Sequence, residues 1–206
     1  MSDTHDYILE MEGIYKAFPG VQALENVDFT LKRGEIHCLV GENGAGKSTL
    51  IKVLTGVDHP DAGRIILDGE EIHTRSPLHA QILGISTVYQ EINLCMNLTV
   101  AENILIGREP HNFFGVDWGK MNAKAAEMFK RLLDIDIDVT KPLGAYTVAI
   151  QQMAAIARAL DITSTKILIL DEPTSSLDAN ETQQLFKVMR KLKENGVGII
   201  FITHFI

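Results

Sequence analysis

The sequence predicts an α/β fold in which helices cover a mostly parallel β-sheet. Short apolar runs at residues 36–40, 167–170 and 198–202 have the length and composition of strands that are buried on both faces. Between them lie segments whose apolar residues recur every three or four positions, as on the inner face of a helix. Because buried strands that alternate with helices form parallel sheets, these two observations predict the fold class.

An antiparallel β subdomain is expected in the N-terminal part of the chain. Residues 8–11 have the composition of a short strand, and residues 27–31 alternate between apolar and polar side chains. Residues 64–72 contain Asp68-Gly69, a dipeptide that is typical of a tight hairpin turn. These strands are expected to join the parallel ones, so that the sheet is mixed at its start.

Helices are expected between and after the strands. The first follows residue 47, because apolar residues recur there at helical spacing at Leu50, Val53, Leu54 and Val57. A second covers residues 151–160. A third begins after Asp178, which forms the pattern of a capping box with Glu181 three residues later.

Residues 94–160 are expected to form a helical subdomain inserted into the core, which comprises about residues 1–93 and 161–206. The insertion contains a segment rich in proline, glycine and aromatic residues at 107–118. A helix then follows, with Ala125, Met128, Phe129, Leu132 and Leu133 on one face. We therefore expect a single domain over residues 1–206 with a second, helical lobe.

Composition argues against several classes of protein. The chain has 206 residues, 46% of them hydrophobic, and a formal net charge of −8. Proteins that coat nucleic acid are usually basic, so no nucleic acid partner is expected. Cys38 and Cys95 lack metal-ligand spacing, which favours a reduced, intracellular compartment. No apolar stretch approaches the roughly 18 residues that cross a bilayer, so we expect any membrane association to depend on a partner.

A phosphate-binding loop follows the first buried strand. Its residues are Gly41, Glu42, Asn43, Gly44, Ala45, Gly46, Lys47, Ser48 and Thr49. Glycines let the backbone wrap a phosphate closely, while amide groups of the loop and of the next helix point at the anion. In this motif Lys47 reaches the β- and γ-phosphates and Ser48 ligates Mg²⁺. The strand before the loop and the helix after it are the context that the motif requires. The sequence therefore predicts a P-loop NTPase core that binds ATP.

Two acidic residues at the end of the second buried strand predict the rest of an ATPase site. Asp171 can hold Mg²⁺ directly or through water. Glu172 can orient and deprotonate the attacking water. Taken alone, an Asp-Glu pair before Pro173 is more often a solvated turn, but the phosphate loop favours the catalytic interpretation.

Further motifs resemble, in order and spacing, those of the ATP-binding cassette (ABC) family over nearly the whole chain. Gln90 matches the Q-loop glutamine, which the family uses at Mg²⁺ and as a link to its transmembrane partner. His204 matches the switch histidine that contacts the γ-phosphate, and Phe18 matches the aromatic that stacks on adenine. Residues 175–178 match the D-loop. Each residue alone has an ordinary alternative: a surface glutamine, a structural histidine or a core aromatic.

The family's signature motif, usually Leu-Ser-Gly-Gly-Gln, corresponds here to Tyr-Thr-Val-Ala-Ile at residues 146–150. Thr147 keeps the hydroxyl, whereas Ala149 replaces the second glycine and Ile150 replaces the glutamine. By the resemblance, Thr147, Val148 and Ala149 face ATP that is bound to another cassette. This divergent signature, followed by Gln-Gln-Met, resembles the ATPases of bacterial monosaccharide importers of the ribose, galactose and galactofuranose kinds.

The resemblance implies an ATPase that energises sugar import from the cytoplasmic face of a bacterial cell membrane. Its implied partners are transmembrane permease subunits, a second cassette in the same longer chain or in a dimer, and indirectly a periplasmic sugar-binding protein. This chain would be the first cassette, ending before the last strands and helix of such a domain. Two alternatives stay open: a soluble ABC protein that acts on nucleic acid or ribosomes, and a catalytically weak regulatory cassette.

Overall fold

The structure is a computed structural model that describes residues 6–42, 44–89, 93–160 and 165–204. In these ranges it has two separate four-stranded β-sheets, a two-stranded hairpin and a group of helices. The antiparallel sheet has the order β2 (Val21–Lys32), β1 (Tyr7–Phe18), β4 (Ala62–Leu67) and β5 (Glu70–Ile72). The parallel sheet has the order β3 (Ile36–Val40), β10 (Gly198–Thr203), β9 (Ile167–Asp171) and β6 (Ile85–Val88). The expectation of one mixed sheet is therefore wrong for the described residues.

The antiparallel sheet contains the predicted hairpin. Asp68 and Gly69 have φ angles of +56° and +81° between β4 and β5, as the two central residues of a type I′ turn require. The strand predicted at residues 8–11 is only part of β1, which has 12 residues. Gly13, with φ +56°, lies where the register of β1 with β2 shifts, so apolar alternation is interrupted there.

The parallel sheet separates two apolar cores. In β9, Leu168 and Leu170 pack into one core, whereas Ile167 and Ile169 pack into the other, because successive side chains of a strand point to opposite faces. All four are fully buried. The three predicted strands pair in parallel as expected, while β6 was not predicted from the sequence.

Helices α1 (Lys47–Leu54), α2 (Pro77–Leu83) and α6 (Ala179–Glu194) belong to the sheet-containing part of the chain. The predicted capping box of α6 is confirmed, because Asp178 and Glu181 each accept a hydrogen bond from the other's backbone N–H. The prediction for Val57 is wrong: α1 ends at Leu54, and Val57 lies beyond the helix with an exposed side chain.

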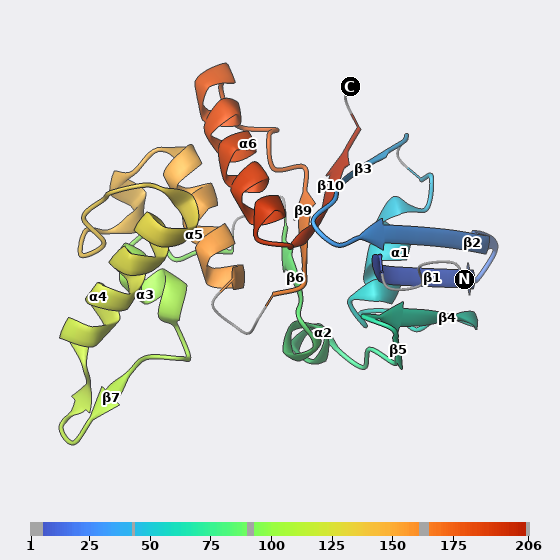
Figure 1. Ribbon diagram of the computed structural model, residues 1–206, viewed down its shortest axis with the longest axis horizontal. Helices are drawn as coiled ribbons and strands as arrows, with labels where there is room; N and C mark the ends of the chain where they lie inside the picture. The colour runs from blue at the N-terminus through green and yellow to red at the C-terminus, as the bar shows by residue number, and fades with distance from the viewer. Residues whose placement is uncertain (1–5, 43, 90–92, 161–164, 205–206) are drawn as a thin grey trace.

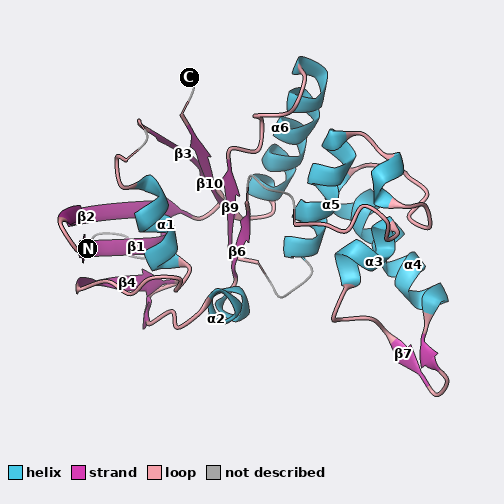
Figure 2. Ribbon diagram, turned by 180° about the vertical axis from the view of Figure 1, so that it is seen from behind, coloured by secondary structure: helices cyan, strands magenta, loops and turns pink. Residues whose placement is uncertain are grey.

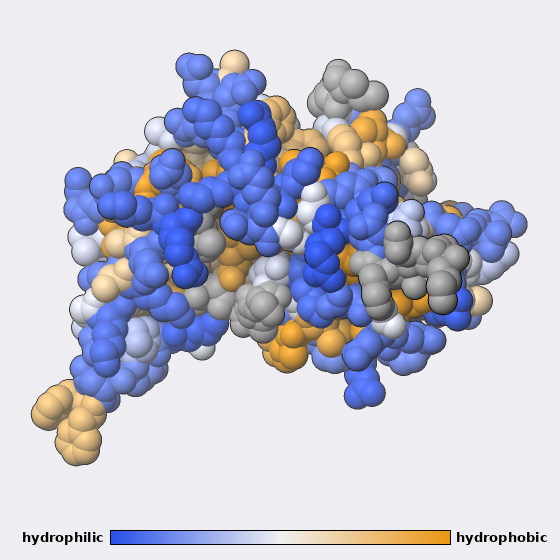
Figure 3. Space-filling view, in the orientation of Figure 1, coloured by the Kyte–Doolittle hydropathy of each residue, from blue (hydrophilic) through white to orange (hydrophobic). Residues whose placement is uncertain are grey.

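A helical lobe lies on the far side of the parallel strands from the antiparallel sheet and α1 (Figures 1 and 2). Its elements are α3 (Val100–Leu105), the hairpin β7 (His111–Asn112) and β8 (Gly115–Val116), α4 (Trp118–Met128), a π-helical turn (Phe129–Leu133), a 3₁₀ turn (Leu143–Ala145) and α5 (Val148–Leu160). The β7–β8 hairpin carries an apolar tip, visible in Figure 3, where Phe113 and Phe114 are almost fully exposed. Across the described ranges, no helix is both long and apolar enough to cross a membrane.

Candidate nucleotide-binding site

A pocket of about 380 Å³ lies where the end of β1, the loop before α1 and the end of β9 meet. Residues 44–49 of the phosphate loop line it, together with Phe18, Asp171 and Glu172. Three segments that are distant in sequence therefore converge on one cavity. The parallel sheet explains part of this convergence, because β3 and β9 both pair with β10 and so end at the same edge.

The backbone of the phosphate loop is shaped by its glycines. Gly46 has φ +85°, and a Cβ built there would lie 2.8 Å from the carbonyl oxygen of Ala23. Only glycine satisfies both constraints. Gly46 also caps α1 without a side-chain hydrogen bond, so the first turn of the helix directs its amide groups toward the pocket with no capping side chain between them.

Lys47 gives the pocket its positive charge. Its Nζ donates to the backbone carbonyl of Glu42 at 2.9 Å and to that of Gly41. Gly41 and Glu42 are not among the described residues that line the pocket. Their contribution is to hold the ammonium of Lys47 through their backbone carbonyls. An ammonium held by carbonyl oxygens can exchange them for phosphate oxygens, which are stronger acceptors.

Asp171 and Glu172 bring negative charge to the pocket. Burial raises the pKa of Asp171 above its usual value and the charge of Glu172 adds to this, whereas Lys47 lowers it. A bound cation would relieve this unfavourable burial of a carboxylate. The described residues contain no group of three or more His, Cys, Asp or Glu that could hold a metal ion. A cation here would therefore need oxygen ligands from Ser48, phosphates and water.

Glu172 is held in position by two contacts. Its backbone is left-handed, with φ +48°, an uncommon conformation for a residue other than glycine. Its N–H donates to the carbonyl of Ile202 at 3.0 Å, and its Oε1 lies 2.6 Å from Nδ1 of His204. This contact joins the carboxylate to the histidine ring across the end of the parallel sheet.

Phe18 lies at the end of β1 and is 38% exposed at the pocket. It is paired with Val21 across a tight turn, which also brings Gln22 and Ala23 into the pocket lining. Val21, Gln22 and Ala23 were not predicted as part of the site from the sequence. The signal that would have found them is Pro19-Gly20, a turn that folds the next strand back beside Phe18.

The signature residues do not reach this pocket. Thr147 and Val148 are exposed at the start of α5, whereas the side chain of Ala149 is buried. Figures 1 and 2 place α5 on one side of the parallel strands and α1 on the other. The remaining predicted site residues, Asn43 and Gln90, lie outside the described residues.

The family follows from a comparison of the whole sequence with known families. A family model described as ABC transporter matches residues 24–175 of the 206-residue chain. This chain belongs to the ABC transporter family. The cassette also resembles a solved ATP-binding cassette of an ABC transporter in its ADP conformation, with a TM-score of 0.84 at 27% identity, covering 97% of this chain and 82% of that one. A dimeric bacterial ABC transporter cassette gives a TM-score of 0.75 at 26% identity, with 96% and 88% covered.

Curated relatives are more similar in sequence. The cassette is 54% identical over 205 residues to the galactofuranose transporter ATP-binding protein of Escherichia coli strain K12, covering 100% of the cassette and 41% of that relative. It is 52% identical to a fructose import ATP-binding protein of Bifidobacterium longum, covering 97% and 39%, and 52% identical to a ribose import ATP-binding protein of Rubrobacter xylanophilus, covering 96% and 39%. The chain thus spans well under half the length of these relatives.

Proposed function

We propose that this cassette binds ATP with Mg²⁺ and hydrolyses it to energise the import of a sugar. The observation that carries the proposal is the pocket that gathers the phosphate loop, Phe18, Asp171 and Glu172. The sugar is inferred from the relatives, whose names refer to galactofuranose, fructose and ribose.

Binding begins with charge neutralisation. Lys47 and the amide groups at the start of α1 would hold the β- and γ-phosphates. Ser48 and Asp171 would hold Mg²⁺, since a hydroxyl and one carboxylate together with phosphates and water form the oxygen set that this ion takes in nucleotide sites. Gln90 is proposed as a further ligand of Mg²⁺ only because it matches the Q-loop glutamine in sequence. The metal supplies neutralisation of the charge on the phosphate oxygens.

Hydrolysis is assigned to Glu172 and His204. The carboxylate of Glu172 would accept a proton from the attacking water, which requires that its orientation be fixed. Its left-handed backbone and the 2.6 Å contact with His204 fix that orientation. His204 is therefore proposed to hold the base in place and to contact the γ-phosphate.

The second half of the site is proposed to come from another cassette. Thr147, Val148 and the backbone of Ala149 begin α5, a 13-residue helix whose N-terminus would face the γ-phosphate of ATP bound to the partner. The partner is a second cassette, in the rest of a longer chain or in a second copy. Permease subunits and, indirectly, a periplasmic sugar-binding protein would complete the assembly, with the cassette on the cytoplasmic face of the membrane.

The test is the change Glu172→Gln. We expect ATP hydrolysis to fall by about 100-fold or more while ATP affinity is kept, because the amide cannot accept the proton. The matched control is Glu127→Gln, which makes the same exchange at an exposed position of α4. Unchanged turnover in the Glu172 variant would contradict the assignment of the base. A wild-type chain that binds ATP without hydrolysing it would support the regulatory alternative instead.

A further inference from the structure

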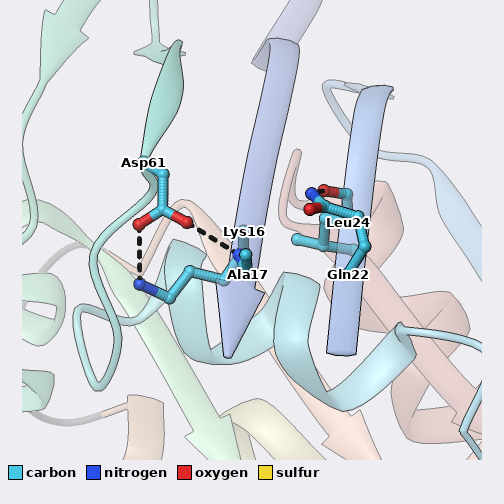
Figure 4. Close-up of polar contacts among 5 residues, drawn as sticks. All are labelled: Lys16, Ala17, Gln22, Leu24 and Asp61. Atoms are coloured by element: carbon cyan, nitrogen blue, oxygen red, sulfur yellow. Dashed lines mark hydrogen bonds and ion pairs between the residues drawn. The ribbon is translucent and has the colours of Figure 1, made fainter. Parts of the chain in front are cut away.

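Asp61, the residue before β4, holds the end of β1 through three consecutive residues. Its Oδ2 accepts from the backbone N–H of Ala17 at 2.7 Å, and its Oδ1 accepts from Nζ of Lys16 at 3.1 Å (Figure 4). Its own N–H donates to the carbonyl of Tyr15 at 2.8 Å. The next residue along β1 is Phe18, whose ring lines the nucleotide pocket.

The end of β1 requires such support because its strand pairing is incomplete there. The register of β1 with β4 ends at the pair Tyr15–Ala62. Beyond that pair, the N–H of Ala17 has no strand partner on the β4 side, and the carboxylate of Asp61 takes the place of the missing ladder acceptor. The register with β2 also shifts between Lys16 and Ala17.

Lys16 links the carboxylate to the aromatic ring. Its side chain is only 16% exposed, and its Nζ lies 5.6 Å from the centroid of the Phe18 ring, within the range of a cation–π contact. Neither Lys16 nor Asp61 is among the described residues that line the pocket. The pair therefore supports the ring from outside the cavity. The N–H of Ala17 and then Lys16 lower the pKa of Asp61, because both contacts favour the charged carboxylate.

We propose that Asp61 is a positioning residue for recognition of the nucleotide base, because it fixes the end of β1 and with it the ring of Phe18. This inference deepens the proposed function and rests on it, since it takes Phe18 to be the residue that stacks on adenine. A ring held in place before binding loses less conformational freedom when the base stacks on it. The contribution of Asp61 should therefore depend on the base and not on the phosphates.

The experiment compares Mg²⁺-ATP with Mg²⁺-tripolyphosphate, which has the phosphates but no base, by calorimetric titration of the 206-residue chain. We expect Asp61→Ala to weaken ATP binding by about threefold to tenfold and to change tripolyphosphate binding less than about twofold. Asp61→Asn should fall between Asp61→Ala and the wild type, because the amide oxygen still accepts from Ala17 but loses the ion pair with Lys16. In a Phe18→Ala background, Asp61→Ala should add nothing, since the two residues act through one ring.

The matched control is Asp28→Ala. Asp28 also accepts from a backbone N–H of β1, that of Gly13 at 2.7 Å, but not beside Phe18. We expect this variant to leave both affinities unchanged. Equal losses for ATP and tripolyphosphate in Asp61→Ala, or additive effects of Asp61→Ala and Phe18→Ala, would overturn the inference. If Phe18→Ala alone has no effect, the inference also fails while ATP binding stands. If the wild type binds neither ligand, the proposed function itself fails.

Discussion

The phosphate-loop pocket and the start of α5 are the two regions of this chain that are proposed to contact ATP, and their architectures are opposite. At the pocket, an ammonium, two carboxylates and an aromatic ring from separate segments converge within one cavity. At α5, Thr147 and Val148 face solvent on the other side of the parallel strands. Under the proposed function, the first region would bind a nucleotide by itself, whereas the second would act only against a partner. The difference is what the proposal expects if one cassette carries halves of two different sites.

The change Lys47→Ala should have the largest effect on the pocket. Loss of a charge-assisted contact to phosphate should weaken ATP binding by roughly 100-fold. The control is Lys52→Ala, in the same helix but exposed and away from the pocket, which should bind ATP normally. Titration with a fluorescent ATP analogue measures both. Normal ATP affinity in the Lys47 variant would break the assignment of this region as the binding half.

The change Gly46→Ala should come next, through the fold of the loop. The left-handed backbone and the 2.8 Å approach of the added Cβ to the Ala23 carbonyl should together lower the free energy of unfolding by about 2 kcal/mol. Gly44→Ala is the matched comparison, because Gly44 has nearly the same φ, +87°, but nothing within 4 Å of its Cβ position. The Gly44→Ala change should lower the free energy of unfolding by about 1 kcal/mol. Equal losses in denaturant unfolding would show that the close packing against β2 has no energetic role.

The change Thr147→Arg sharpens the comparison from the other region. The added bulk and charge are at an exposed position, so ATP affinity and stability should stay within experimental error of the wild type. ATP hydrolysis should fall by about tenfold, because the closed pair of cassettes is disturbed. The control for the added charge is Val57→Arg, which places an arginine at another exposed position. It should leave ATP hydrolysis unchanged. A drop in ATP affinity with Thr147→Arg would contradict the separation of the two halves.

The change Asp171→Asn should have the smallest effect and a pH signature. Because burial and then Glu172 raise the pKa of Asp171 above 3.8 in the folded chain, its charged form is less favourable there than in the unfolded chain. Wild-type stability is therefore lost as pH rises from about 3.8 through the folded-state pKa. Without nucleotide, Asp171→Asn should melt at a higher temperature than the wild type at pH 7.5, and the gap should narrow as the pH falls through the folded-state pKa of Asp171. A lower melting temperature at pH 7.5 would contradict this account.

Local chemistry made much of the fold predictable. Asp68-Gly69 requires a turn that accepts two positive φ angles, and Asp178 with Glu181 satisfies the first amide groups of α6. The strand β6 was missed because Ser86 interrupts its apolar run, although this hydroxyl is buried and donates to the carbonyl of Ala159. Val57 was misassigned although the signal is local, because Gly56 ends α1 in a left-handed turn in which its N–H donates to the carbonyl of Val53 and the N–H of Val57 donates to that of Lys52. Gly56 turns there with φ +71°, close against the backbone of Thr74.

The candidate site was predictable where one segment carries its chemistry. Residues 44–49 are recognisable from their own order, and Asp171-Glu172 from the buried strand before them. The supporting contacts were not predictable, because they join residues distant in sequence. Asp61 is 44 residues from Ala17, and Glu172 is 32 residues from His204. Such pairs depend on strand register and on the crossover connections of the sheet, which no local pattern encodes.

Mixing two impaired variants tests most directly the claim that each site is built from halves of two cassettes. A chain with Lys47→Ala keeps its signature half, and a chain with Thr147→Arg keeps its binding half. With equal amounts and random pairing, half of the pairs are mixed and each mixed pair has one complete site, so about a quarter of wild-type ATP hydrolysis should return. No activity beyond the sum of the separate variants, while the Thr147→Arg chain binds ATP normally, would contradict the account.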